Sequence, residues 1–210
     1  MEGSLRRLQR DVLDVYQLHS SPPPEQWDGA FETLEELKAK GLIRFYGMAL
    51  GGEEAALKAI RETGVSTMML SYNMLEQSLA GSVMAAAQAK GVGLIVRQPL
   101  ASGMFSGQLA PDTVFAEDDY RKTWPRQQFL HDLRKVDAIK ATIGDGTTTL
   151  SQAALKFILA HPAVSSVVPG MMTPAQVDDG VLASDHSLDP EIVSEIRALY
   201  EHGYPGTAPP

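Results

Sequence analysis

The sequence predicts an α/β fold built on a parallel sheet, and three observations support this prediction. Short apolar runs alternate with amphipathic helical patterns along the chain. The first four runs begin at similar intervals, near residues 12, 42, 65 and 92. The runs are apolar throughout, which is typical of strands covered on both faces. Strands that are joined by helices must run parallel, with right-handed crossovers.

The individual elements follow from the same patterns. The strand candidates are five short apolar runs, which cover residues 12–18, 42–50, 65–73, 92–100 and 163–170. The helix candidates carry apolar residues at helical spacing, and the first three end at a glycine, a common residue after a helix. They cover residues 27–41, 53–64, 80–91, 127–143, 151–159, 174–183 and 190–200. The helix at 151–159 should be capped by Thr149 or Ser151.

The alternation is interrupted once, by the long polar segment 101–126. We expect this segment to be a loop insertion, with its acidic run at 117–119 in solvent. Nothing indicates a second domain, so residues 1–210 should form a single domain with a loose tail at 203–210.

The composition excludes several classes of protein. The net charge is -8, and the 18 Lys and Arg residues are scattered, which argues against a nucleic-acid partner. The absence of cysteine excludes disulfides and Cys-ligated zinc, and the histidines have no metal-binding spacing, so we expect no metal site. No apolar run is long enough to span a membrane, and the first residues lack the apolar stretch of a secretory signal. We therefore expect a cytoplasmic protein that does not bind membranes.

The candidate ligand site lies where the predicted strands end, because ligands of parallel α/β folds gather at the carboxyl ends of the strands. No GxGxxG or GxxxxGK[ST] motif follows a strand, which argues against a Rossmann or P-loop protein. The polar side chains expected at these ends belong to His19, Tyr72, Asn73, Arg97 and Gln98.

Each of the prominent residues also has a purely structural interpretation. His19 could close its strand by binding a backbone carbonyl, or it could transfer a proton, since an imidazole titrates near neutral pH. Arg97 could form a salt bridge or lie in solvent, or its guanidinium could bind a carboxylate or phosphate. For Tyr72, packing in the core is favoured over acid catalysis.

Five longer stretches together point to a known family. They read SLRRLQRDVLDVYQLH, LKAKGLIRFYGMAL, LSYNMLEQS, GVGLIVRQPLASGMFSG and AVSSVVPGMMTPAQVDDG. In this order they resemble the aldo-keto reductase family from its third helix onward, which corresponds to the family's C-terminal two-thirds. The resemblance implies a (β/α)8 TIM barrel, of which this chain holds about five of eight strands. It also implies NADPH-dependent reduction of a small carbonyl compound.

The resemblance also assigns roles to individual residues. His19 corresponds to the catalytic histidine, and Arg97 and Tyr72 correspond to substrate-binding positions. The cofactor-binding positions are Asn73, Pro99, Leu100, Ala101, Ser102, Gly103, Gly170 and Gln176.

The chain also departs from the family pattern. The family's catalytic Asp, Tyr and Lys precede the matching stretches and have no counterpart here. Polar or basic cofactor contacts of the family are replaced by Ala49, Leu50, Met69, Met172 and Gly180. A lost neutral hydrogen bond weakens binding by about 0.5–1.5 kcal/mol and a lost charged one by about 1.5–3 kcal/mol. We therefore expect NADPH binding to be weakened or lost, and this chain alone not to transfer hydride.

Two further functions stay open beside an impaired reductase. One is a cofactor-independent enzyme that uses proton transfer, such as a cyclase, isomerase or dehydratase of a small carbonyl metabolite. The other is a non-catalytic binding subunit. A partial barrel also leaves strand edges beside 12–18 and 163–170, so we expect a homodimer or a complementing chain to cover them.

Overall fold

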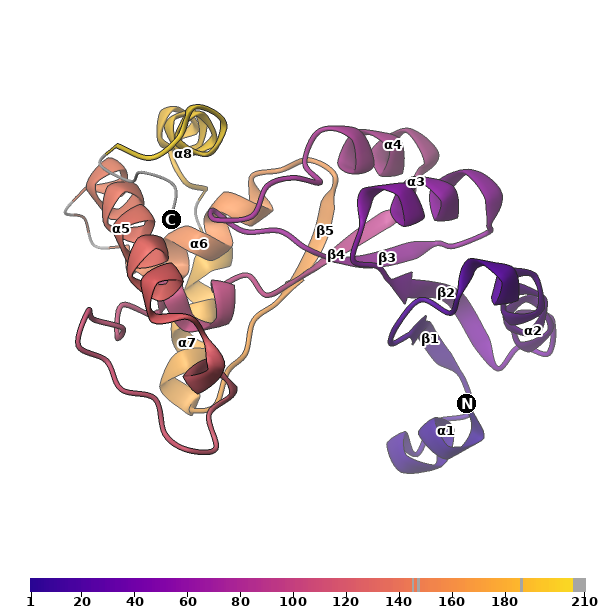
Figure 1. Ribbon diagram of the computed structural model, residues 1–210. Helices are drawn as coiled ribbons and strands as arrows, with labels where there is room; N and C mark the ends of the chain where they lie inside the picture. Colours follow the sequence, from indigo (N-terminus) through magenta and orange to yellow (C-terminus); the bar gives the residue numbers. More distant parts are fainter. Residues whose placement is uncertain (145, 147, 186, 206–210) are drawn as a thin grey trace. The chain divides into compact units, whose positions relative to one another are not determined.

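The computed structural model describes residues 1–205 apart from 145, 147 and 186, and it contains an open sheet of five parallel strands (Figure 1). The strands follow one another in sheet order as β1 (Leu13–Leu18), β2 (Ile43–Ala49), β3 (Thr67–Ser71), β4 (Gly93–Arg97) and β5 (Val164–Val168). Each lies within its predicted apolar run. The predicted α/β class and the incomplete barrel type are confirmed, because the five strands do not close into a ring.

Eight α-helices lie within the described residues. They are α1 (Glu2–Leu8), α2 (Trp27–Ala39), α3 (Glu53–Glu62), α4 (Ser82–Lys90), α5 (Arg126–Ile143), α6 (Leu150–Leu159), α7 (Pro174–Val181) and α8 (Pro190–His202). The helix α1, which buries no residue, was not among the helices predicted from periodicity, but the resemblance placed the family's third helix at this point of the chain. Short 3-10 helices are η1 (Pro24–Gln26), η2 (Ala101–Ser106), η3 (Tyr120–Thr123) and η4 (Leu182–Ser184).

The contacts divide the chain into two compact units. The first contains Met1–Leu70, Leu79–Val96 and Pro162–Ser166, and therefore most of the sheet. The second contains Ser71–Ser78, Arg97–His161 and the residues from Val167 onward.

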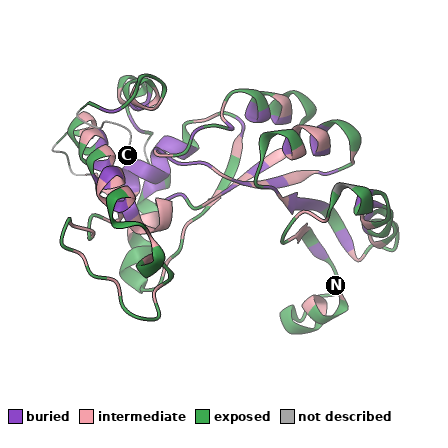
Figure 2. Cartoon of the chain, viewed as in Figure 1, coloured by how far each residue is buried: buried purple, intermediate pink, exposed green. Residues whose placement is uncertain are grey.

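In the first unit the two faces of the sheet differ. Tyr46, Met48 and Met68 are fully buried, and α2 packs on β2 at this side (Figure 2). On the other face, Val15 and Phe45 are paired across β1 and β2 and are 42% and 50% exposed. This apolar pair is therefore left without a cover in the chain described.

One close approach in this unit depends on a glycine. A Cβ built at Gly47 would lie 2.1 Å from the carbonyl oxygen of Thr67, and Gln17 Nε2 donates across this position to Thr67 Oγ1 at 2.9 Å. No other residue fits between β1 and β3 at this point without moving the backbone.

The second unit is organised around α6, whose residues Gln152–Ile158 are all buried. A hydrogen bond also fixes the end of the described chain in this unit. The hydroxyl of the buried Tyr204 donates it to the carbonyl oxygen of Met74 at 3.0 Å. The predicted loose tail is therefore wrong for Tyr204, and residues 206–210 of that tail lie outside the described part of the chain.

The predicted insertion 101–126 carries local structure of its own. It begins with η2 and contains η3, and Phe115 makes edge-to-face contacts with Trp124 and Phe129. The insertion is thus anchored on α5 by an aromatic cluster. Among the described residues, no helix is both long enough and apolar enough to cross a membrane.

Candidate active site

The predicted catalytic and substrate residues fall in both units. His19 follows β1 in the first unit, where it is exposed and makes no hydrogen bond to any residue that the structure describes. The interpretation in which a backbone carbonyl holds its ring is therefore not supported by a contact. Arg97 ends β4 and is half-buried; its Nε is inaccessible and has no hydrogen-bond partner among the described residues.

Tyr72 is packed inside the second unit. Its side chain is fully buried, and its ring stacks on Phe157, with 5.6 Å between centroids, and meets the edge of His161. Burial raises the pKa of the Tyr72 phenol, and the positive charge of Arg197 opposes that rise. Its packing matches the structural interpretation made from the sequence, and the hydroxyl is poorly placed to exchange protons with water.

The predicted cofactor loop after β4 has an unusual backbone. Three non-glycine residues adopt left-handed conformations, with φ of 54° at Gln98, 46° at Ala101 and 55° at Ser102, followed by Gly103 at 93°. Such conformations cost about 1–2 kcal/mol per L-residue, so surrounding contacts must hold them. Strain of this kind is typical of ligand-binding loops.

Asn73 is one of the residues that hold this loop. Its Nδ2 donates to the carbonyl oxygen of Gln98 at 3.0 Å, while its Oδ1 accepts from the backbone N–H groups of Leu75 and Glu76 at 2.9 and 3.0 Å. Asn73 is buried, and each polar atom of its amide is engaged. It therefore acts on the loop by positioning it.

Arg121 is the second such residue, and sequence reasoning missed it. Its Nη1 donates to the carbonyl oxygen of Ser102 at 3.2 Å, and its guanidinium lies 4.9 Å from the ring centre of Phe115. A bidentate ion pair with Asp119, with 2.6 Å from Nη2 to Oδ2, lowers the pKa of that carboxyl. The acidic run 117–119 was predicted to lie in solvent. This prediction is wrong for Asp119, whose carboxylate is paired with Arg121. The sequence did not indicate the pair, because both residues lie in the insertion, which has no helical spacing.

The start of α7 forms the opposite side of the candidate site. Thr173 and Gln176 form a capping box, in which Gln176 Oε1 accepts from the N–H groups of Met172 and Thr173 at 2.6 and 3.2 Å. The Nε2 amide group of Gln176 remains as a donor. Helix N-termini favour anions, so this end of α7 adds a favourable field for a negatively charged ligand.

Further along α7, a glycine makes room for a methionine. A Cβ at Gly180 would lie 2.2 Å from Cε of Met171, so the Met171 side chain fills the space that a residue at 180 would use. This wall is apolar where the sequence comparison led us to expect an amide in the family.

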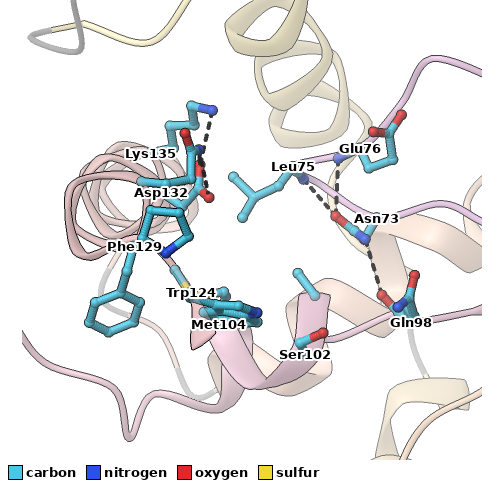
Figure 3. A pocket seen from close by; sticks show the side chains of 13 residues that line it. Asn73, Leu75, Glu76, Gln98, Ser102, Met104, Trp124, Phe129, Asp132 and Lys135 are labelled. Carbon is cyan, nitrogen blue, oxygen red and sulfur yellow. Dashed lines mark hydrogen bonds and ion pairs between the residues drawn. The ribbon is translucent and has the colours of Figure 1, made fainter. Parts of the chain in front are cut away.

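These segments line two adjoining cavities within the second unit, of about 700 and 420 Å³, which share five lining residues. Six of the eight predicted cofactor residues line the larger cavity: Pro99, Leu100, Ser102, Gly103, Gly170 and Gln176. Asn73 and Ala101 instead line a third cavity of about 450 Å³ (Figure 3). The structure thus brings most of the predicted cofactor residues together, and it places Tyr72 in the core.

The two adjoining cavities differ in how much open space and how much charge their linings offer a ligand. Gly170 lines both, and a Cβ there would meet no atom within 4 Å, so the space beside it is open. Within the described part of the chain, Arg121 is the one basic side chain that lines the larger cavity, and its charge is paired with Asp119. The larger cavity therefore offers open space, but its described lining holds no unpaired positive charge. No cluster of metal-ligating side chains occurs among the described residues.

Comparison with known proteins identifies the relationship. The model of the aldo/keto reductase family matches residues 1–201, essentially the whole chain. Among curated proteins, the uncharacterized oxidoreductase YrpG of Bacillus subtilis is 27% identical over 206 residues, which cover 95% of this chain and 62% of that protein. The NADH-specific methylglyoxal reductase of Escherichia coli is 24% identical, with coverage of 95% and 62%.

Solved structures agree on the fold. The apo form of an aldo-keto reductase from Bacillus halodurans superposes with a TM-score of 0.77 at 27% identity, and it covers 94% of this chain and 65% of that one. An aldo/keto reductase from Klebsiella pneumoniae in complex with NADP and acetate gives a TM-score of 0.68 at 23% identity. The chain spans less than two thirds of the length of these relatives. Because the family model covers nearly every residue, the chain belongs to the aldo/keto reductase family.

Proposed function

We propose that this chain is part of a nicotinamide-dependent oxidoreductase that reduces a small carbonyl compound. The observation that carries the proposal is the convergence of the strained loop 98–103 and the start of α7 on one cavity of about 700 Å³. Family membership supports it, since relatives are named as oxidoreductases and one as a methylglyoxal reductase.

The cofactor would lie along the two adjoining cavities. Its diphosphate suits the N-terminus of α7 and the loop around Ser102 and Gly103, and its adenine suits the apolar wall at Met171. When bound, such a cofactor supplies hydride. The family resemblance favours NADPH, but Met172 carries no charge for a 2′-phosphate and is 90% exposed. We therefore expect weak binding of NADPH, or its loss.

The roles of the remaining predicted residues belong to this proposal as well. For His19, in the first unit, the proposal keeps the catalytic role that the resemblance implies. For Arg97, in the second unit, it keeps a substrate-binding role, and the buried Nε of this residue has no partner among the described residues. Tyr72 would shape the substrate site from within the core. The resemblance assigns no general acid within residues 1–210, since the family's catalytic Asp, Tyr and Lys have no counterpart in the matching stretches.

A second candidate function has one observation in its favour. The pairing of Gly180 with Met171, like the replacement of a basic residue by Met172, removes polar contacts that a nucleotide would use. A cofactor-independent enzyme acting on a small carbonyl metabolite by proton transfer, or a non-catalytic binding subunit, would tolerate this loss.

The assembly proposal rests on the open sheet. Among the described residues no strand lies beyond β1, and Val15 of β1 and Phe45 of β2 are exposed. We expect a second copy or a complementing chain to cover this edge, in a cytoplasmic protein. Light scattering of the purified chain should give the mass of a dimer or a larger complex; a stable monomer at micromolar concentration would rule out the homodimer.

The function is tested by titrating the chain with NADPH and with NADH while following cofactor fluorescence. Gly170→Leu should weaken binding by about tenfold or more, because its side chain would project into the open space of both cavities. Gly29→Leu is the matched control, since a Cβ there also meets no atom, but on α2. Equal affinity of Gly170→Leu and the wild type would overturn the cofactor proposal. Absence of saturable binding of both NADPH and NADH by the wild type would favour the second, cofactor-independent candidate function.

A further inference from the structure

The third cavity, of about 450 Å³, is also lined by the strained loop and is not accounted for by the nucleotide proposal (Figure 3). Three stretches of the second unit build it: the turn after β3, the loop after β4, and the first half of α5 with the residues before it. Gln98 and Ser102 line both this cavity and the larger nucleotide cavity.

One wall of this cavity is apolar and aromatic. Met104 and Trp124 lie along one side in Figure 3, Phe129 projects from α5, and Leu75 reaches in from the turn after β3. The rings of Trp124 and Phe129 pack against each other, with 6.3 Å between their centroids, so each ring helps to fix the orientation of the other. Such a surface suits a flat apolar body, and aromatic faces attract cations.

The other side of the cavity is acidic. On α5, Asp132 forms an ion pair with Lys135 at 3.1 Å and accepts from Gln128 Nε2 at 3.0 Å. Across the cavity stands Glu76, whose carboxylate accepts from the backbone N–H of Ser78 at 3.0 Å. The lining contains two carboxylates and one ammonium group, so it carries one net negative charge.

We propose that this cavity binds a small organic cation: an ammonium group carried on a flat apolar or aromatic body. The ammonium would lie between Asp132 and Glu76, and the body would lie against Trp124 and Phe129. The one basic residue of the lining, Lys135, is already paired, so an anion would meet a net negative charge. The net charge of -8 over the whole chain also favours the approach of a cation.

The site is coupled to the proposed nucleotide site through shared residues. The carbonyl oxygen of Gln98 is held by Asn73, and that of Ser102 is held by Arg121, on a backbone with φ above 50° at both positions. A ligand that contacts Gln98 or Ser102 in the third cavity should therefore change the affinity of the larger cavity for its own ligand. The binding proposal itself does not depend on the reductase proposal.

Isothermal titration calorimetry with tryptamine tests the site directly. Tryptamine carries an indole and an ammonium group, and indole-3-propionate is its anionic counterpart of similar size. We expect saturable binding of tryptamine, and at least tenfold weaker binding of indole-3-propionate. Absence of saturable tryptamine binding up to millimolar concentration, or equal binding of the two compounds, would overturn the proposal.

Two variants locate the binding within the cavity. Asp132→Asn should weaken tryptamine binding by about tenfold, and Glu76→Gln by about threefold, since each keeps an acceptor oxygen and loses only charge. Asp137→Asn is the matched control, because Asp137 lies on the same helix but does not line this cavity. The site is refuted if both Asp132→Asn and Glu76→Gln bind tryptamine as tightly as the wild type, or if Asp137→Asn weakens binding equally.

Discussion

Two helices of the second unit begin with the same capping box and use it differently. At α6, Thr149 and Gln152 cap the helix, and both side chains are bound in turn by Asp179, with 2.8 Å from Gln152 Nε2 to Oδ1. At α7, Thr173 and Gln176 make the same reciprocal bonds, but both residues are exposed. The same local motif thus has a buried glutamine tied to Asp179 of α7 in one place and two exposed side chains in the other, and residues of both boxes line the smaller of the two adjoining cavities.

This difference teaches what a short motif can and cannot decide. The Thr-x-x-Gln spacing settles the first turn of a helix, because its bonds run within four residues. Whether the box stabilises the fold or faces a ligand depends on a third partner. For Gln152 this partner is Asp179, which is 27 residues away and so cannot be read from the local motif. The two boxes therefore call for parallel substitutions.

The largest effect is expected at the buried box. Gln152→Ala removes the bond to the N–H of Thr149 and leaves Asp179 without its amide donor in a part-buried setting. We expect the free energy of unfolding to fall by about 2 kcal/mol, measured by urea denaturation. A loss below the error of the extrapolation would show that the two boxes are equivalent, contrary to the comparison.

The matching change at the exposed box should affect binding more than stability. In Gln176→Ala, water can replace the lost hydrogen bonds to the N–H groups of Met172 and Thr173. The free energy of unfolding should therefore change by no more than about 0.5 kcal/mol. NADPH affinity should fall by about three- to tenfold, because the amide that lines both nucleotide cavities is gone. A stability loss as large as that of Gln152→Ala would remove the distinction.

The smallest effect is expected from pH. It concerns the ion pair between Arg121 and Asp119, because Arg121 lines the larger cavity together with Gln176 of the exposed box. Arg121 holds the pKa of Asp119 below 3.8 in the folded protein, so the ion pair stabilises above pH 3.8 and this stabilisation is lost as the pH falls further. The midpoint temperature of thermal unfolding should therefore fall further for the wild type than for Asp119→Asn when the pH is lowered from 5 to 3. Parallel curves for the two proteins would mean that the pair does not contribute to stability.

Much of the fold could be predicted from the sequence, and the reasons are local. Strands and helices lie within a few residues of their predicted bounds, since apolar periodicity and terminal glycines act over short distances. Of the two caps suggested for α6, Thr149 is confirmed, while Ser151 donates its hydroxyl to the carbonyl oxygen of Phe105 instead. The helix α1 was indicated by the resemblance of its stretch to the family's third helix, and not by periodicity.

The site was predictable only where it continues a strand or a helix. Predicted cofactor residues of the loop after β4 and of the start of α7 line one cavity, whereas the contacts that hold the loop were not predicted. Arg121 reaches Ser102 from 19 residues away across an irregular segment, where no periodicity links the two. The third cavity depends on α5 meeting the turn after β3, which is likewise a tertiary event.

The bond from Tyr204 to Met74 has a consequence for how the second unit assembles. It joins residues 130 positions apart, whereas each capping box closes within one helical turn. The entropy lost on closing a chain segment grows with its length, and contacts between distant residues slow folding. We expect this bond to form after α5 and α6 are in place, so that shortening the chain before Tyr204 would speed unfolding while leaving the early collapse unchanged.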